Sequence, residues 1–111
     1  TLDLSDEALE LVAARFRLLG DASRLRLLRA LMEADHSVQQ LVEECELSQT
    51  NVSRHLGLMR SDGIVARRSE GNRAVYSIAD PSIRKLCRTV CGGLSDRMAG
   101  ELDALQGGAT S

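Results

Sequence analysis

Two cysteine thiols lie four residues apart near the end of the chain, at Cys87 and Cys91. On a helix, side chains at this spacing share one face, so the two sulfur atoms could together bind a soft ion such as As(III), Hg(II), Cd(II) or Cu(I). The two Cα atoms would be about 6 Å apart, which also lies within the range of a disulfide. The pair is therefore a candidate metal, metalloid or redox sensor, and packing of two small apolar side chains is the alternative.

The third cysteine, Cys45, falls on the apolar face of an expected helix, which favours a core position over a third ligand at the sensor. An odd number of cysteines argues against a framework of disulfides. It suits a reducing compartment such as the cytoplasm.

A second group of side chains has the chemistry for DNA recognition. Ser48–Ser61 predicts a helix that begins with a serine cap and buries Val52, Leu56 and Met59 at helical spacing. Its other face carries amide, hydroxyl and guanidinium groups without any carboxylate. These groups complement base edges in the major groove, where the neighbouring phosphates repel carboxylates. The candidate DNA-binding residues of this helix are Gln49, Thr50, Asn51, Ser53 and Arg54.

Helices must position these groups. Apolar residues at helical spacing follow a capping serine or aspartate at Ser5, Asp21 and Ser37. The link Glu46–Ser48 is short, and two short helices joined in this way predict a helix-turn-helix. The predicted helices before this link are Leu4–Leu19, Ala22–Glu33 and Ser37 to about Cys45.

After Asp62-Gly63 the sequence pattern changes from helix to strand. Two strands, Ile64–Ser69 and Ala74–Ile78, flank a turn at Glu70–Arg73. A hairpin that directly follows a helix-turn-helix is typical of a wing. Arg67, Arg68 and Arg73 of this wing are placed to reach phosphates or the minor groove.

A last helix begins at Pro81 and extends to about Leu105. It carries an apolar stripe that is long for so small a protein, and a second copy of the chain related by a two-fold axis is the simplest partner for it. The stripe consists of Ile83, Leu86, Cys87, Val90, Cys91 and Leu94. We expect one domain over residues 1–106 and a flexible tail over 107–111.

Charge is distributed unevenly along the 111 residues, whose net charge is −2. Residues 48–73 contain five arginines and two carboxylates, whereas residues 1–47 contain five arginines and ten carboxylates. The positive charge thus coincides with the predicted reading helix and wing. No apolar run approaches a membrane-spanning length and no signal peptide is visible, so we expect a cytoplasmic protein.

The order of elements and four local strings are similar to the ArsR/SmtB family of winged-helix repressors, which respond to metals, metalloids or thiol oxidants. The strings are Leu18–Leu28, Leu47–Leu56, Asp62–Val65 and Tyr76–Asp80. The resemblance implies a mainly helical, homodimeric winged helix-turn-helix with the first and last helices at the interface. It also implies that the helix Ser48–Ser61 and the wing bind operator DNA, and that an inducer releases them.

Two sensor sites common in this family do not carry over. The third helix begins Ser37–Leu41 without the Cys-x-Cys motif of many members. The positions of a zinc site on the last helix would be Asp80, Ser82, Gly93 and Asp96, and two carboxylates without an imidazole make a poor zinc site. Cys87 and Cys91 therefore remain the candidate sensor, with Cys45 as a third ligand to be tested.

The sequence thus predicts a repressor released from DNA by a soft metal or metalloid ion, or by a thiol oxidant. The alternative is a constitutive DNA-binding or protein-interaction module without a working cysteine sensor. An enzyme is not expected, because no nucleophile–base pair, carboxylate cluster or glycine-rich phosphate loop is visible.

Overall fold

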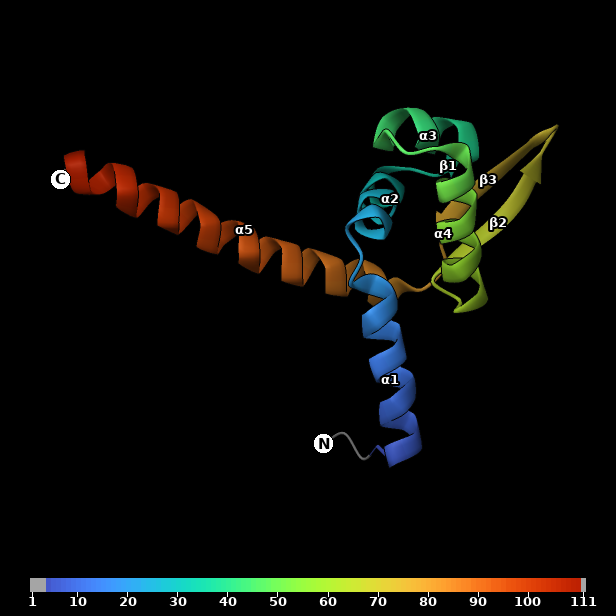
Figure 1. Cartoon of the computed structure of the whole chain (residues 1–111), viewed down its shortest axis with the longest axis horizontal. Helices are drawn as coiled ribbons and strands as arrows, with labels where there is room; N and C mark the ends of the chain where they lie inside the picture. The colour runs from blue at the N-terminus through green and yellow to red at the C-terminus, as the bar shows by residue number, and fades with distance from the viewer. Residues whose placement is uncertain (1–3, 111) are drawn as a thin grey trace. The chain divides into compact units, whose positions relative to one another are not determined.

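The computed structural model of the chain describes residues 4–110, and side chains as far as Glu101. The chain divides into two compact units, and the boundary between them lies between Asp80 and Pro81. The predicted domain, 1–106, spans both units and stays a prediction. In chain order the helices and strands are α1 (Asp6–Leu19), α2 (Ala22–Glu33), β1 (His36–Ser37), α3 (Val38–Cys45), α4 (Gln49–Ser61), β2 (Val65–Glu70), β3 (Arg73–Ile78) and α5 (Pro81–Thr110) (Figure 1).

The first four helices begin where their capping residues predict. Each cap is a serine or aspartate in extended conformation, and its side chain accepts a hydrogen bond from the backbone N–H three residues ahead. Such a cap contributes about 0.5–2 kcal/mol, so the sequence fixes these starts locally. The pairs are Ser5 with Ala8, Asp21 with Arg24, Ser37 with Gln40 and Ser48 with Asn51.

The sheet has three antiparallel strands in the order β1-β3-β2, one more than the predicted hairpin. The additional strand β1 is only two residues long, and it pairs His36 with Tyr76 and Ser37 with Val75. Two residues are too few for an alternating pattern, so the sequence did not reveal this strand. At the hairpin turn, Gly71 has a φ of 61°, a left-handed conformation that glycine adopts without steric cost.

Apolar side chains of α2, α3 and α4 form the core of the first unit, and the hairpin packs beside α4 (Figure 1). Val52, Leu56 and Met59 are fully buried, which confirms the predicted buried face of α4. Burial of this face directs the polar face of the same helix to solvent.

Arg15 fastens α1 to the rest of the first unit. Its Nε donates to Asp62 Oδ2 at 3.0 Å and its Nη2 to the Asp62 carbonyl at 2.6 Å. Its Nη1 donates to Asp80 Oδ2 at 2.7 Å. This Arg15 clamp joins the first helix to the end of α4 and to the residue that closes the unit. Leu19 is the only residue of α1 that is buried.

The second unit is the single helix α5. It continues through Gly92 and Gly93 without a break and reaches Thr110, beyond the predicted end near Leu105. The predicted flexible tail over 107–111 stays a prediction, because the side chains of that segment lie outside the described residues. Among the described residues, no helix is both long and apolar enough to cross a membrane.

Candidate nucleic-acid interface

The five polar side chains predicted for recognition all lie on the exposed side of α4: Gln49, Thr50, Asn51, Ser53 and Arg54. We call this group the reading face. None of the five is acidic, and the first turn of α4 holds no acidic residue. The helix N-terminus adds the partial positive charge of its dipole at the same end. The reading face therefore offers hydrogen-bond donors and positive potential to an anionic partner.

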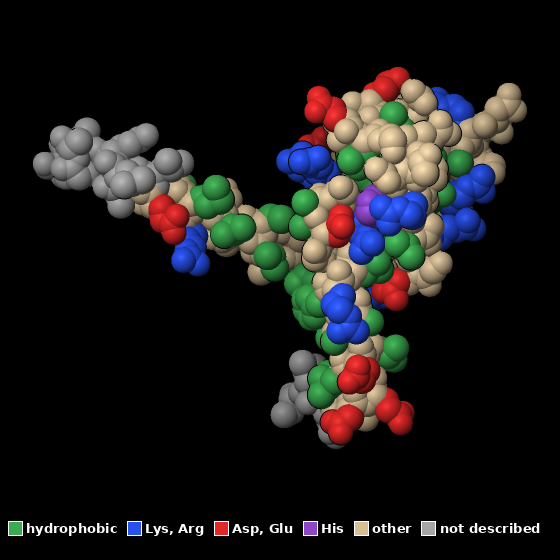
Figure 2. Space-filling model, in the orientation of Figure 1, with side chains coloured by type: hydrophobic (Ala, Val, Ile, Leu, Met, Phe, Trp, Pro, Cys, Tyr) green, Lys and Arg blue, Asp and Glu red, His purple; other side chains and the backbone are tan. Residues whose placement is uncertain are grey.

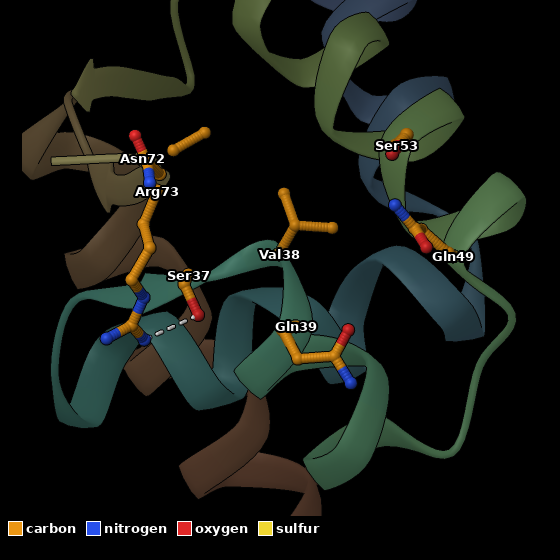
Figure 3. A pocket seen from close by; sticks show the side chains of 8 residues that line it. Ser37, Val38, Gln39, Gln49, Ser53, Asn72 and Arg73 are labelled. Atoms are coloured by element: carbon orange, nitrogen blue, oxygen red, sulfur yellow. Dashed lines mark hydrogen bonds between the residues drawn. The ribbon is translucent and has the colours of Figure 1, made fainter. Parts of the chain in front are cut away.

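A hollow of about 310 Å³ adjoins the reading face, between α3, α4 and the hairpin turn. In Figure 3, Gln49 and Ser53 lie on one side of it and Asn72 and Arg73 on the other. The N-terminal turn of α3 lies between the two sides, with Val38 and Gln39 labelled there. No carboxylate lines the hollow. The structure thus brings α4 and the wing tip together around one acid-free depression.

Ser37 holds Arg73 in this hollow. Arg73 Nη2 donates to Ser37 Oγ at 3.0 Å, drawn as the dashed line in Figure 3. Ser37 is buried and caps α3 with the same oxygen. The guanidinium of Arg73 therefore reaches back to the base of the helix-turn-helix.

The other two wing arginines differ in their surroundings. Arg68 donates to Asp35 at 2.6 Å and to Glu70 at 2.7 Å, so two carboxylates compensate its charge. The side chain of Arg67 has no hydrogen-bond or ion-pair partner among the residues that the structure describes. Side chains alternate along a strand, so Arg67 and Arg68 lie on opposite faces of β2. The two cannot contact one DNA surface in the same way.

His55 lies beneath the reading face and is 4% exposed. Its Nδ1 accepts a hydrogen bond of 3.1 Å from Arg24 Nε, so His55 is a packed, hydrogen-bonded histidine. Burial lowers the pKa of His55, and the positive charge of Arg54 lowers it further. The ring is therefore neutral near pH 7.

Positive side chains gather around this part of the first unit. In Figure 2, blue side chains lie along the side that carries α4 and the hairpin. Three carboxylates near them, Asp35, Asp62 and Glu70, are engaged in ion pairs with arginines. These carboxylates are thus already paired with Arg15 and Arg68, and Arg54 of the reading face has no ion pair among the described residues.

The cysteines lie in two different settings. Cys87 is buried and Cys91 is exposed, one helical turn apart on α5. Burial raises the pKa of the Cys87 thiol, and Cys91 raises it further. Cys45 is buried in the first unit, where its Sγ donates to the Arg26 carbonyl at 3.6 Å. Among the described residues, no group of three or more His, Cys, Asp or Glu side chains is arranged to bind a metal ion.

Sequence reasoning missed several residues of this region. The guanidinium of Arg24 binds His55 and the Leu18 carbonyl, two contacts that no sequence pattern predicted. Ser37 and Gln39 were read only as the start of a helix, although both line the hollow. The capping pattern Ser37-x-x-Gln40 did mark the helix start, but no sequence signal showed that the wing tip would lie against it.

Comparisons with known proteins agree with this architecture. The sequence model described as "Bacterial regulatory protein, arsR family" matches residues 21–67, which run from the start of α2 into β2. The chain is 37% identical to the uncharacterized HTH-type transcriptional regulator Rv0081 of Mycobacterium tuberculosis, over 96% of this chain and 98% of the relative. The crystal structure of that protein superposes with a TM-score of 0.78 and 34% identity, covering 88% of this chain and 99% of the other.

Two further relatives have more informative descriptions. The solution structure of the homodimeric winged helix-turn-helix DNA-binding domain Mb0332 from Mycobacterium bovis superposes with a TM-score of 0.77 and 26% identity, covering 88% of this chain and 94% of that domain. A probable mercury resistance operon repressor of Streptomyces lividans is 35% identical over 64% of this chain and 57% of its own length.

Proposed function

This chain belongs to the ArsR/SmtB family of bacterial transcriptional regulators, and we propose that it acts in the cytoplasm as a homodimeric repressor that binds operator DNA through α4 and the wing. Its relatives are transcriptional regulators rather than enzymes. In this proposal an inducer acts on α5 and releases the repressor from DNA.

The observation that carries the DNA-binding role is the reading face. A chain of net charge −2 presents a helix face of amides, hydroxyls and Arg54 with no carboxylate. The acid-free hollow extends this face to Arg73. Phosphate neutralisation and base recognition both need this combination of donors.

Unpaired apolar surface on α1 and on α5 supports the homodimer. Phe16 is 57% exposed and Val12 39% on α1, and Val90, Leu94 and Met98 are all more than half exposed on α5. Exposed apolar stripes of this kind are typical of interfaces. The relative Mb0332, whose structure is described as homodimeric, offers a precedent for pairing.

Cys87 and Cys91 are the proposed sensor. Their i, i+4 spacing on α5 suits a soft ion bound through two sulfur atoms, with loss of the thiol protons. Cys91 is exposed, so an ion or oxidant would meet its thiol first. Two thiols suit Hg(II), whereas As(III) and Cd(II) would take a further ligand from Cys45, a second protomer or solvent. The mercury resistance repressor among the relatives supports a soft-metal inducer.

A constitutive regulator without a cysteine sensor is the second candidate. The raised pKa of Cys87 favours it, because a protonated thiol reacts slowly with oxidants and binds metal only after losing its proton. The lack of any cluster of three or more potential ligands among the described residues favours it too.

Replacing both Cys87 and Cys91 by serine should abolish the response to inducer and leave DNA binding intact. Fluorescence anisotropy on promoter DNA measures the DNA affinity. Titration with Hg(II), Cd(II), arsenite or hydrogen peroxide then measures the response to inducer. Cys45→Ser is the matched control for Hg(II), which two thiols bind, and this variant should respond to Hg(II) like the wild type; loss of its response to arsenite or Cd(II) alone would make Cys45 the third ligand for those ions. If no ion or oxidant releases the wild-type protein, the constitutive alternative holds.

Replacing Arg73 by alanine should weaken binding to all DNA sequences to a similar degree. The loss of one phosphate contact should reduce the slope of log affinity against log salt by about 1. Arg68→Ala is the control, since its charge is already paired with Asp35 and Glu70. Binding measured over a series of salt concentrations gives the slope for each variant. Equal slopes for Arg73→Ala and Arg68→Ala would mean that Arg73 makes no phosphate contact.

A further inference from the structure

The imidazole of His55 connects the reading helix to the helices behind it. His55 Nδ1 accepts from Arg24 Nε of α2, and Arg24 Nη1 donates to the Leu18 carbonyl near the end of α1, at 3.0 Å. The Arg24 backbone N–H also donates to Asp21, the cap of α2. The guanidinium of Arg24, which belongs to the first turn of α2, therefore holds the end of α1 and the middle of α4 together.

This arrangement fixes the protonation state of the ring. A guanidinium only donates, so Nδ1 must carry a lone pair and the proton of the neutral ring lies on Nε2. Nε2 lies 3.5 Å from Arg54 Nη2, which is another donor. Two N–H groups do not bond to each other, so His55 supports α4 without holding the guanidinium of Arg54. That guanidinium, which is exposed, stays available to a partner in solution.

Protonation of the ring would disturb this arrangement. A charged His55 could no longer accept from Arg24 and would face the positive charges of Arg24 and Arg54. Asp21 is the carboxylate that faces the ring from α2, and its attraction opposes them only in part. Burial and these charges lower the pKa of His55, so acidification costs the folded protein stability as the pH falls below the ordinary histidine pKa of about 6.5.

We propose that His55 is a positioning residue for DNA recognition, which accepts from Arg24 as a neutral ring and thereby fixes α4 so that Arg54 meets the bases. The proposal rests on the DNA-binding function proposed above. A recognition side chain must be held within about 0.5 Å of its productive place by its supporting residues. Phosphate contacts tolerate more movement than base contacts, so the loss of His55 should lower specificity more than general affinity.

The test compares a promoter duplex with a scrambled duplex of equal length and salt. His55→Leu removes the acceptor at similar volume, and we expect the preference for the promoter to fall about tenfold, as for a loss of one to two base contacts. His55→Asn keeps an acceptor and does not titrate, so its preference should stay within about threefold of the wild type. Circular dichroism confirms that each variant is folded.

The pH dependence provides a readout that a purely structural role would not change. Between about pH 7.5 and a pH low enough to protonate His55, which lies below the ordinary histidine pKa of about 6.5, the wild-type preference should fall about fivefold, whereas His55→Asn should show no such fall. His36→Asn is the control, because His36 is the only other histidine in the sequence, and it should keep the wild-type pH dependence. The preference is the ratio of the affinities for the promoter and the scrambled duplex. The general tightening of DNA binding at low pH affects both affinities and therefore cancels in this ratio.

The outcomes separate the two proposals. A His55→Leu variant that keeps the promoter preference, or a wild-type preference that is constant with pH, would overturn the role of His55. A wild-type protein that binds both duplexes equally at both pH values would instead overturn the operator-binding function itself. The His55→Asn comparison remains decisive even if His55→Leu does not fold.

Discussion

Replacing Arg54 by alanine is expected to lower the affinity for operator DNA by about 5- to 150-fold, because a bidentate contact to a guanine is worth about 1–3 kcal/mol. Arg54 lies exposed on α4 beside the buried His55, so its loss removes a recognition group without opening the core. Anisotropy at one fixed salt concentration measures the change, and substitution of each operator base in turn identifies the position at which specificity relaxes.

Arg60→Ala provides the matched control for this prediction. Arg60 carries the same charge in the last turn of the same helix, away from the N-terminal half that forms the reading face. It should weaken binding only a few-fold and equally for all sequences, as expected for a lost phosphate contact. If Arg54→Ala behaved in the same way as Arg60→Ala, Arg54 would be a phosphate contact, and base recognition would be assigned to the amides and hydroxyls of α4.

The largest stability effect is expected from Leu56→Ala. Leu56 is fully buried on the inner side of α4, and replacing a buried leucine by alanine costs about 2–5 kcal/mol through lost burial and the remaining cavity. Small proteins are stable by only about 5–15 kcal/mol, so this substitution consumes a large part of the total. Urea denaturation followed by circular dichroism measures the change in the free energy of unfolding.

Leu58→Ala makes the same replacement at an exposed position of the same helix, so it controls for the change in helix propensity. Leu58 is 43% exposed, so its replacement should change stability by no more than about 0.5 kcal/mol. Both variants must be compared at one protein concentration, because the stability of a dimer depends on concentration. A loss for Leu58→Ala as large as that for Leu56→Ala would mean that the outer face of α4 is covered in the assembled protein.

Local chemistry explains which parts of the fold were predictable. Caps such as Ser48 determine helix starts from a few neighbouring residues, and the spacing of Val52, Leu56 and Met59 determines the buried side of α4. The family resemblance correctly gave the order of elements, and the comparisons confirmed it. The polar composition of the reading face followed from the same periodicity, although its contact with DNA stays a prediction.

Contacts between distant segments explain what was not predictable. The alternation of a strand separates Arg67 from Arg68, but only the folded chain shows that Arg68 meets Asp35, 33 residues away. The two-residue strand β1 forms by pairing with the edge of β3, and no local sequence pattern predicts this pairing. The partner of Arg24 is likewise set by the packing of α2 against α4, 31 residues apart.

The Arg15 clamp also has a consequence for the order in which the protein is made. Its two partners follow Arg15 by 47 and 65 residues, so the ribosome must complete the wing before the clamp can close. Residues synthesised first fold first where their contacts are local, and loops of this length close late. The helix α1 can therefore form early on a nascent chain, but it docks only after Asp80 has emerged. Docking buries only Leu19 of this helix, so its other apolar side chains stay open to chaperones and to neighbouring nascent copies even after the clamp has closed.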